Sequence, residues 1–281
     1  MLYLFLNVVF VSFYALLYKA SSRRGCRPLS VNLLLSFSAT VMIAAYMALT
    51  RTVAFHPTAA LLGGIQGVFG WVAVLAFFQV ALHGELSVSW TIMNLCLILP
   101  IGASLVFWKE IPNLYQVAGI VLIIPSLILF GNMGHRQGSI SRKWLKFLII
   151  SFLASGVSQI LSKAVHEMGV DRYKAVFMLF SYGVSFLLTA GLIGARGTFP
   201  TGKEVVMGSL MGLLSLLTAS CALIALESLR GIVVFPVGGA GNLVLTAALS
   251  FLVFRERLDR RKVSAILLAV AAIVLISIRT Q

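Results

Sequence analysis

Residues 231–253, GIVVFPVGGAGNLVLTAALSFLV, form an apolar stretch in which no side chain carries a charge. Crossing the hydrocarbon core of a bilayer takes roughly 20 residues of helix, so the stretch has the length of a membrane span. Only helices and closed barrels satisfy their backbone hydrogen bonds inside lipid, and barrel strands are shorter and alternate in polarity. The stretch therefore predicts a transmembrane α-helix.

Similar apolar segments recur along the whole chain. Of its 281 residues, 60% are hydrophobic and only 11% are charged, whereas a soluble domain has roughly 25% charged residues. Residues 1–10 have no basic region and no small-residue cleavage site, so we expect them to begin the first span. We predict an all-α membrane protein with ten transmembrane helices, at residues 2–18, 29–49, 58–82, 86–107, 114–131, 144–165, 174–194, 203–226, 231–253 and 262–278.

The charged residues are mostly basic, with 22 Lys and Arg against 8 Asp and Glu. In a soluble protein this excess would suggest a nucleic-acid partner, but here the basic residues lie in short loops, where anionic headgroups attract them. We expect no nucleic-acid partner. The three cysteines are scattered and the four histidines lie in loops or at span ends, so we expect no metal site and no cofactor.

The two halves of the chain resemble each other. A shift of 144 residues places Lys19 on Lys163, Gly25 on Gly169 and Gly64 on Gly208, and a shift of 146 aligns residues 107–110 with 253–256. We therefore predict a first five-helix repeat at residues 1–131, a connecting loop at 132–143 and a second repeat at 144–281. Because each half has an odd number of spans, the second half enters from the opposite face, as in many secondary transporters.

Two segments carry a family resemblance. Asn94 to Glu110 contains Pro100 and ends in Phe-Trp-Lys-Glu, and residues 231–258 contain Pro236, the Gly-Gly-Ala-Gly run at 238–241 and a second basic-Glu pair ending at Glu256. The chain resembles the drug/metabolite transporter superfamily, in its ten-helix EamA-like branch. The resemblance implies alternating access around a cavity lined by spans one, three and four and their repeat partners. The two prolines do not align under the repeat, and Ala265 stands at the counterpart of Gly119.

Polar residues inside these spans are the candidate site, because an unpaired polar group in hydrocarbon is costly. Trp90 and Asn94 are four residues apart and share a helix face, which offers an indole for stacking beside an amide. Each such residue has an alternative role as an interhelical hydrogen bond, and Trp90 as an interfacial aromatic. We predict that the substrate-binding residues are Tyr14, Trp71, Trp90, Asn94, Gln159 and Asn242.

Charged residues lie at span ends or in loops. Lys19 and Lys163 end the first span of each half; they either snorkel to the headgroups or attract an anionic substrate. No Asp or Glu lies in the middle of a span, so we predict transport that is not driven through a buried carboxylate, with Glu227 the nearest candidate. Glu110 and Glu256, which resemble signature residues of that family, are expected to stabilise the N-terminus of the helix that follows each of them.

We therefore predict a secondary transporter for a small neutral, zwitterionic or soft cationic metabolite. The alternatives are a flippase for a lipid-linked precursor and a non-transporting membrane partner. No catalytic motif is present, so we expect no enzyme. The expected partners are the substrate and the lipid bilayer, the chain being a monomer or homodimer in the bacterial cytoplasmic membrane.

The membrane orientation follows from charge. Loops after odd-numbered spans hold 15 of the 22 Lys and Arg residues, and the positive-inside rule then places both termini outside. The resemblance implies both termini inside, so the two arguments disagree. We follow the charge count.

Overall fold

The computed structural model describes residues 1–51, 55–83, 95–131, 142–197, 199–254 and 260–278. All regular structure in these ranges is helical. The helices are α1 (Leu2–Arg23), α2 (Pro28–Leu49), α3 (Pro57–His83), the 3₁₀ turn η1 (Leu95–Leu97), α5 (Ile98–Val106), α6 (Leu114–Gly131), α7 (Arg142–Glu167), the 3₁₀ turn η2 (Asp171–Tyr173), α8 (Lys174–Arg196), α9 (Gly202–Ser228), α10 (Gly231–Phe254) and α11 (Arg260–Ser277).

These helices confirm the predicted all-α membrane fold. Seven of the described helices are long and apolar enough to cross a membrane, and shorter apolar segments lie at Leu114–Ser126 and Val263–Ile276. Of the fourth predicted span, 86–107, only the end is described, as η1 and α5. Large apolar side chains such as Leu187, Leu267 and Val274 are exposed on the outer helix faces. An exposed apolar surface of this extent suits a lipid environment.

Local signals explain where several helices begin and end. Thr201 and Glu204 form a capping box that starts α9, and Pro28 occupies the first turn of α2. Gly25 and Gly169 follow α1 and α7 with φ values of 68° and 67°, a conformation that glycine adopts without strain. The two glycines that the shift of 144 aligned therefore have the same backbone geometry.

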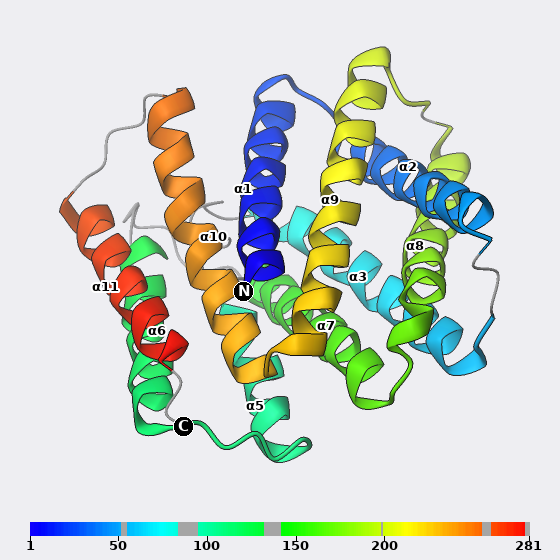
Figure 1. The fold of residues 1–281 in the computed structure, drawn as a ribbon. Helices are drawn as coiled ribbons and strands as arrows, with labels where there is room; N and C mark the ends of the chain where they lie inside the picture. Colours follow the sequence, from blue (N-terminus) through cyan, green and yellow to red (C-terminus); the bar gives the residue numbers. More distant parts are fainter. Residues whose placement is uncertain (52–54, 84–94, 132–141, 198, 255–259, 279–281) are drawn as a thin grey trace.

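Helix packing repeats when the two halves are exchanged. α1 packs on α9 as α7 packs on α3, and α2 packs on α9 as α8 packs on α3. α1 also contacts α10, as α7 contacts α5. Two further pairs join equivalent helices: α2 with α8, at one side of the molecule, and α6 with α11, at the other (Figure 1). α10 also packs on α11. This exchange is the pattern expected of two repeats around a pseudo-two-fold axis, and it supports the predicted inverted repeat.

Close glycine contacts fix the register between the halves. A Cβ at Gly67 of α3 would lie 2.5 Å from the carbonyl oxygen of Ser181 in α8. A Cβ at Gly212 of α9 would lie 2.6 Å from the carbonyl oxygen of Leu35 in α2. These contacts relate α3 to α9 by a shift of 145 and α2 to α8 by a shift of 146. Gly63 is therefore the counterpart of Gly208, which corrects the alignment of Gly64 by one residue; the shift changes along the chain because the connections differ in length.

Candidate functional site

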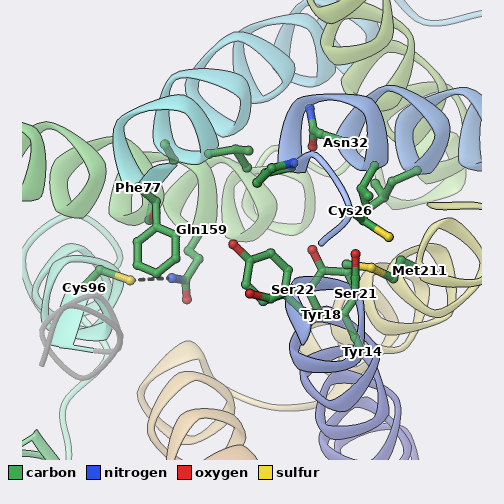
Figure 2. A pocket seen from close by; sticks show the side chains of 16 residues that line it. Tyr14, Tyr18, Ser21, Ser22, Cys26, Asn32, Phe77, Cys96, Gln159 and Met211 are labelled. Carbon is green, nitrogen blue, oxygen red and sulfur yellow. Dashed lines mark hydrogen bonds between the residues drawn. The ribbon is translucent and has the colours of Figure 1, made fainter. Parts of the chain in front are cut away.

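A cavity of about 330 Å³ lies between α1, α2, α3, α7 and α9 (Figure 2). Three aromatic rings, a thioether and two thiols dominate its walls. We call this space the aromatic lobe; its lining residues are Tyr14, Tyr18, Ser21, Ser22, Cys26, Pro28, Val31, Asn32, Leu35, Ala73, Val74, Phe77, Cys96, Ser155, Gln159 and Met211.

A second cavity of about 270 Å³ adjoins the first and shares four of its lining residues: Tyr14, Asn32, Leu35 and Val74. Hydroxyl groups dominate its remaining wall, so we call it the hydroxyl lobe. The residues that line only this lobe are Ser36, Gln66, Gly67, Gly70, Ser158, Ser162, Phe177, Met178, Ser181, Tyr182, Ser185, Ser215, Ala219, Ala222 and Leu223.

Neither lobe is lined by a charged residue in the part of the chain that the structure describes. Burying an unpaired charge in such a low-dielectric space is costly, since nothing in the wall would compensate it. Apolar walls with a few placed polar groups are typical of small-molecule sites. The cavity therefore suits an uncharged organic molecule.

Hydrogen bonds hold the polar side chains of the walls in place. Asn32 donates through Nδ2 to Thr189 Oγ1 at 3.1 Å, which joins α2 to α8. Gln66 donates to Ser162 Oγ at 2.8 Å and to the carbonyl oxygen of Ser158 at 3.2 Å, joining α3 to α7. Gln159 donates to Cys96 Sγ at 3.1 Å (Figure 2). These groups are oriented before any ligand arrives, which lowers the entropic cost of binding.

The structure brings two of the predicted substrate-binding residues into the cavity. Tyr14 lines both lobes and Gln159 lines the aromatic lobe. Trp71 and Asn242 are not among the lining residues of either lobe. The Asn242 Oδ1 accepts hydrogen bonds from Ser12 at 3.4 Å and Thr246 at 2.9 Å, so Asn242 links α10 to α1. This geometry matches the alternative of an interhelical hydrogen bond, and a role of Asn242 in binding stays a prediction.

Trp90 and Asn94 lie outside the described residues. Their predicted shared face, and their role in binding, stay predictions. Trp71 is described: its indole nitrogen is buried and has no hydrogen-bond partner among the described residues.

The two predicted attracting lysines have different surroundings. Lys163 is 2% exposed; its Nζ lies 2.6 Å from Glu110 Oε1 and 2.7 Å from Glu167 Oε1. Lys19, at the equivalent place in α1, is partly exposed, and neither lysine lines a lobe. Lys163 does not snorkel to a headgroup, because its side chain is buried and its ammonium group pairs with two carboxylates of the protein. The attraction of an anionic substrate by this pair stays a prediction, and the buried ion pair favours a structural role for Lys163.

Glu110 lies at a helix N-terminus, but this helix is α10 of the other half and not the helix that follows Glu110 in the chain. Its carboxylate accepts the backbone N–H groups of Gly231 and Ile232, each at 3.0 Å, at the start of α10 rather than α6. Burial raises the pKa of Glu110, but the hydrogen bonds from Lys163 and these two N–H groups outweigh it and leave the pKa below its usual value. Glu110 is therefore a charged link between α5, α7 and α10.

Glu227 pairs with Lys174, at the end of α9, and does not line either lobe. The pairing gives Glu227 a partner within the protein, away from both lobes. Glu85 and Glu256 lie outside the described residues.

Most lining residues were not predicted to bind substrate, and ten of them lie in α2 and α8. The resemblance drew attention to spans one, three and four of each half, whereas α2 and α8 also face the cavity. A periodic signal was present in the sequence: Asn32 and Ser36 are four residues apart, as are Ser181 and Ser185, so each pair shares a helix face.

Comparisons with known proteins agree with this architecture. Residues 142–278 match the EamA-like transporter family. A solved crystal structure of another protein aligns over 98% of this chain and 95% of that chain, with a TM-score of 0.79 and 16% identity, which shows the fold. No curated protein matches in sequence. The resemblance to the drug/metabolite transporter superfamily is confirmed by the family match over residues 142–278, and the long apolar helices support an integral membrane protein.

Proposed function

We propose that this chain, an EamA-like transporter over residues 142–278, moves a small uncharged organic molecule across the membrane by alternating access. The match of residues 142–278 to a transporter family supports the transport of a small molecule. The uncharged cavity between the two halves supports the nature of the solute, because its walls offer hydrogen bonds and apolar contact but no counter-ion.

The observation that carries this proposal is the unequal reach of the two lobes. The aromatic lobe extends to Ser21, Ser22, Cys26 and Pro28, at the connection between α1 and α2. Their counterparts at the connection between α7 and α8 do not line the hydroxyl lobe; they are Val165, His166, Val170 and Lys174. Among the described residues, only one of the two related connections lines the cavity, which is what an inverted repeat predicts for a single state of a transporter.

Charged and aromatic contacts gather at the end that the hydroxyl lobe does not reach. Lys163 binds Glu110 and Glu167, and Lys174 binds Glu227. The rings of His56 and Tyr173 lie 4.7 Å apart, which ties the start of α3 to η2. We infer that these contacts separate when the protein exposes the cavity to the other side.

A filled cavity tests the proposal. Gly70 lines the hydroxyl lobe, and a Cβ there would meet no atom within 4 Å. We expect Gly70→Leu to fold normally but to abolish facilitated uptake of labelled neutral metabolites into proteoliposomes, since its side chain occupies the site. Gly191→Leu is the matched control, because Gly191 also has open space but lies outside both lobes. Full transport by Gly70→Leu would contradict the cavity as the route.

The same vesicles test energy coupling. We expect uptake to proceed without a proton gradient, and Glu227→Gln to retain it, because Glu227 pairs with Lys174 away from the lobes. A proton-driven flux that Glu227→Gln abolishes while binding survives would make Glu227 the coupling group.

A further inference from the structure

The two lobes are lined by equivalent positions of the two halves, but the side chains at these positions differ. The shifts of 144, 145 and 146 that relate α1 to α7, α3 to α9 and α2 to α8 carry eight lining positions of the aromatic lobe onto lining positions of the hydroxyl lobe. Four of these pairs exchange an aromatic or thioether side chain for a small or polar one. Those pairs, aromatic lobe first, are Tyr14 and Ser158, Tyr18 and Ser162, Phe77 and Ala222, and Met211 and Gln66.

We propose that the two lobes form one binding site for a neutral molecule that joins a flat ring to a hydroxyl-bearing group. This inference rests on the proposed function and names the substrate class of the same site. The ring lies in the aromatic lobe against Tyr18, Phe77 and Met211, where aromatic and thioether contacts add to apolar burial. The hydroxyl-bearing group lies in the other lobe.

The hydroxyl lobe has hydrogen-bonding capacity left for a ligand. The side chains of Ser158 and Ser181 make no hydrogen bond with another described residue, although both line the lobe. Hydroxyls both donate and accept, so these two serines complement hydroxyl groups of a solute. A purely apolar solute would leave them unpaired, which disfavours it.

Asn32 marks the junction of the two lobes. It lines both, and its side chain is only 8% exposed. Its amide nitrogen is used by Thr189, and its oxygen points toward the aromatic lobe (Figure 2). No described donor binds that oxygen, so it is placed to accept a hydrogen bond from the part of the solute that connects ring and hydroxyl group. Its counterpart Met178 has no amide oxygen. Only one orientation of the solute therefore gains this hydrogen bond.

Nucleosides test this class, since adenosine joins a neutral flat base to a sugar with hydroxyl groups. Calorimetry on the purified protein compares adenosine with adenine and with ribose. We expect adenosine to bind at least about tenfold more tightly than either part, because it fills both lobes at once. A neutral aryl glycoside, phenyl glucoside, is tested in the same way against phenol and glucose.

Lobe-specific variants separate the two contributions. Tyr18→Ser should weaken adenosine and adenine alike, with Tyr46→Ser on the exposed outer face of α2 as its control. Ser158→Ala combined with Ser181→Ala should weaken adenosine about fivefold or more and leave adenine unchanged, with Ser209→Ala, outside both lobes, as its control.

Two results would overturn the inference: no conjugate binds more tightly than its better half, or the variants of both lobes weaken adenine equally. Failure of the proposed function is distinguishable from these results. If the conjugates bind as expected but no solute crosses proteoliposomes, the site stands and transport falls. If a charged or purely apolar solute is transported while the conjugates do not bind, transport stands and this site falls.

Discussion

At the scale of single residues, Lys163 is a buried cation held between two carboxylates. Lys163 is one of the largest fully buried side chains, and two carboxylates surround its ammonium group. Its Nζ also lies 5.7 Å from the centre of the Trp108 ring. Removing one partner of a buried pair leaves the other charge uncompensated, which costs far more than losing an exposed ion pair.

We expect Lys163→Met to destabilise the protein by about 3–5 kcal/mol, because Glu110 and Glu167 would lose their shared cation. The measurement is thermal or denaturant unfolding of the purified protein. Lys19→Met is the matched control at the equivalent, partly exposed position, and it should cost at most about 1 kcal/mol. Equal losses from the two substitutions would show that the ion pair carries no special stability.

At the scale of helices, small residues decide how closely the two halves approach. Lipid tails are as apolar as the side chains, so helices in a bilayer associate through close packing rather than through the hydrophobic effect. Gly67 and Gly212 bring α3 onto α8 and α9 onto α2, at equivalent places in the two halves. The glycine run in α10 includes Gly241, where a Cβ would lie 3.0 Å from Val8 of α1.

We expect Gly212→Ala to destabilise the protein by about 1–3 kcal/mol, because the new Cβ would meet the backbone oxygen of Leu35 at 2.6 Å and force α2 and α9 apart. Unfolding midpoints provide the measurement. Gly64→Ala is the control: its Cβ would have open space, and alanine favours a helix over glycine by about 0.5–1 kcal/mol. The interface would not depend on glycine if Gly212→Ala proved as stable as the wild type.

At the scale of the whole molecule, two similar halves enclose a cavity whose aromatic lobe reaches the connection between α1 and α2. Cys26 lines the aromatic lobe at that end and is partly exposed, whereas Cys96 and Cys221 are buried. The nearby residues Arg23, Arg24 and Arg27 make this end basic. The positive-inside rule therefore predicts that the cavity faces the cytoplasm in this state.

We expect a membrane-impermeant maleimide to label Cys26 in inverted membrane vesicles but not in intact cells. Mass spectrometry locates the label, and Cys26→Ser should remove it. Labelling in intact cells would place the α1–α2 connection outside and both termini inside, as the family resemblance implies.

The sequence by itself determined the class of protein and most of its helices, and it predicted the repeat. Apolar stretches such as residues 231–253 are long enough to cross a membrane. Their length and composition belong to one continuous segment, so the sequence alone predicts a transmembrane helix there. A shift of 144 aligns Gly25 with Gly169 in the sequence, and the structure gives both glycines the same backbone conformation. Among the site residues, Tyr14 and Gln159 were predicted to bind substrate, and the structure places both in the cavity wall.

Only the tertiary structure decided which polar residues face the cavity and which join helices. Asn32 and Asn242 look alike in sequence, since each is an amide within an apolar span. Asn242 meets Ser12 and Thr246, whereas Asn32 meets Thr189 through its nitrogen and turns its oxygen toward the aromatic lobe (Figure 2). The difference depends on the rotation of each helix against its neighbours, and close contacts between residues more than a hundred positions apart set that rotation.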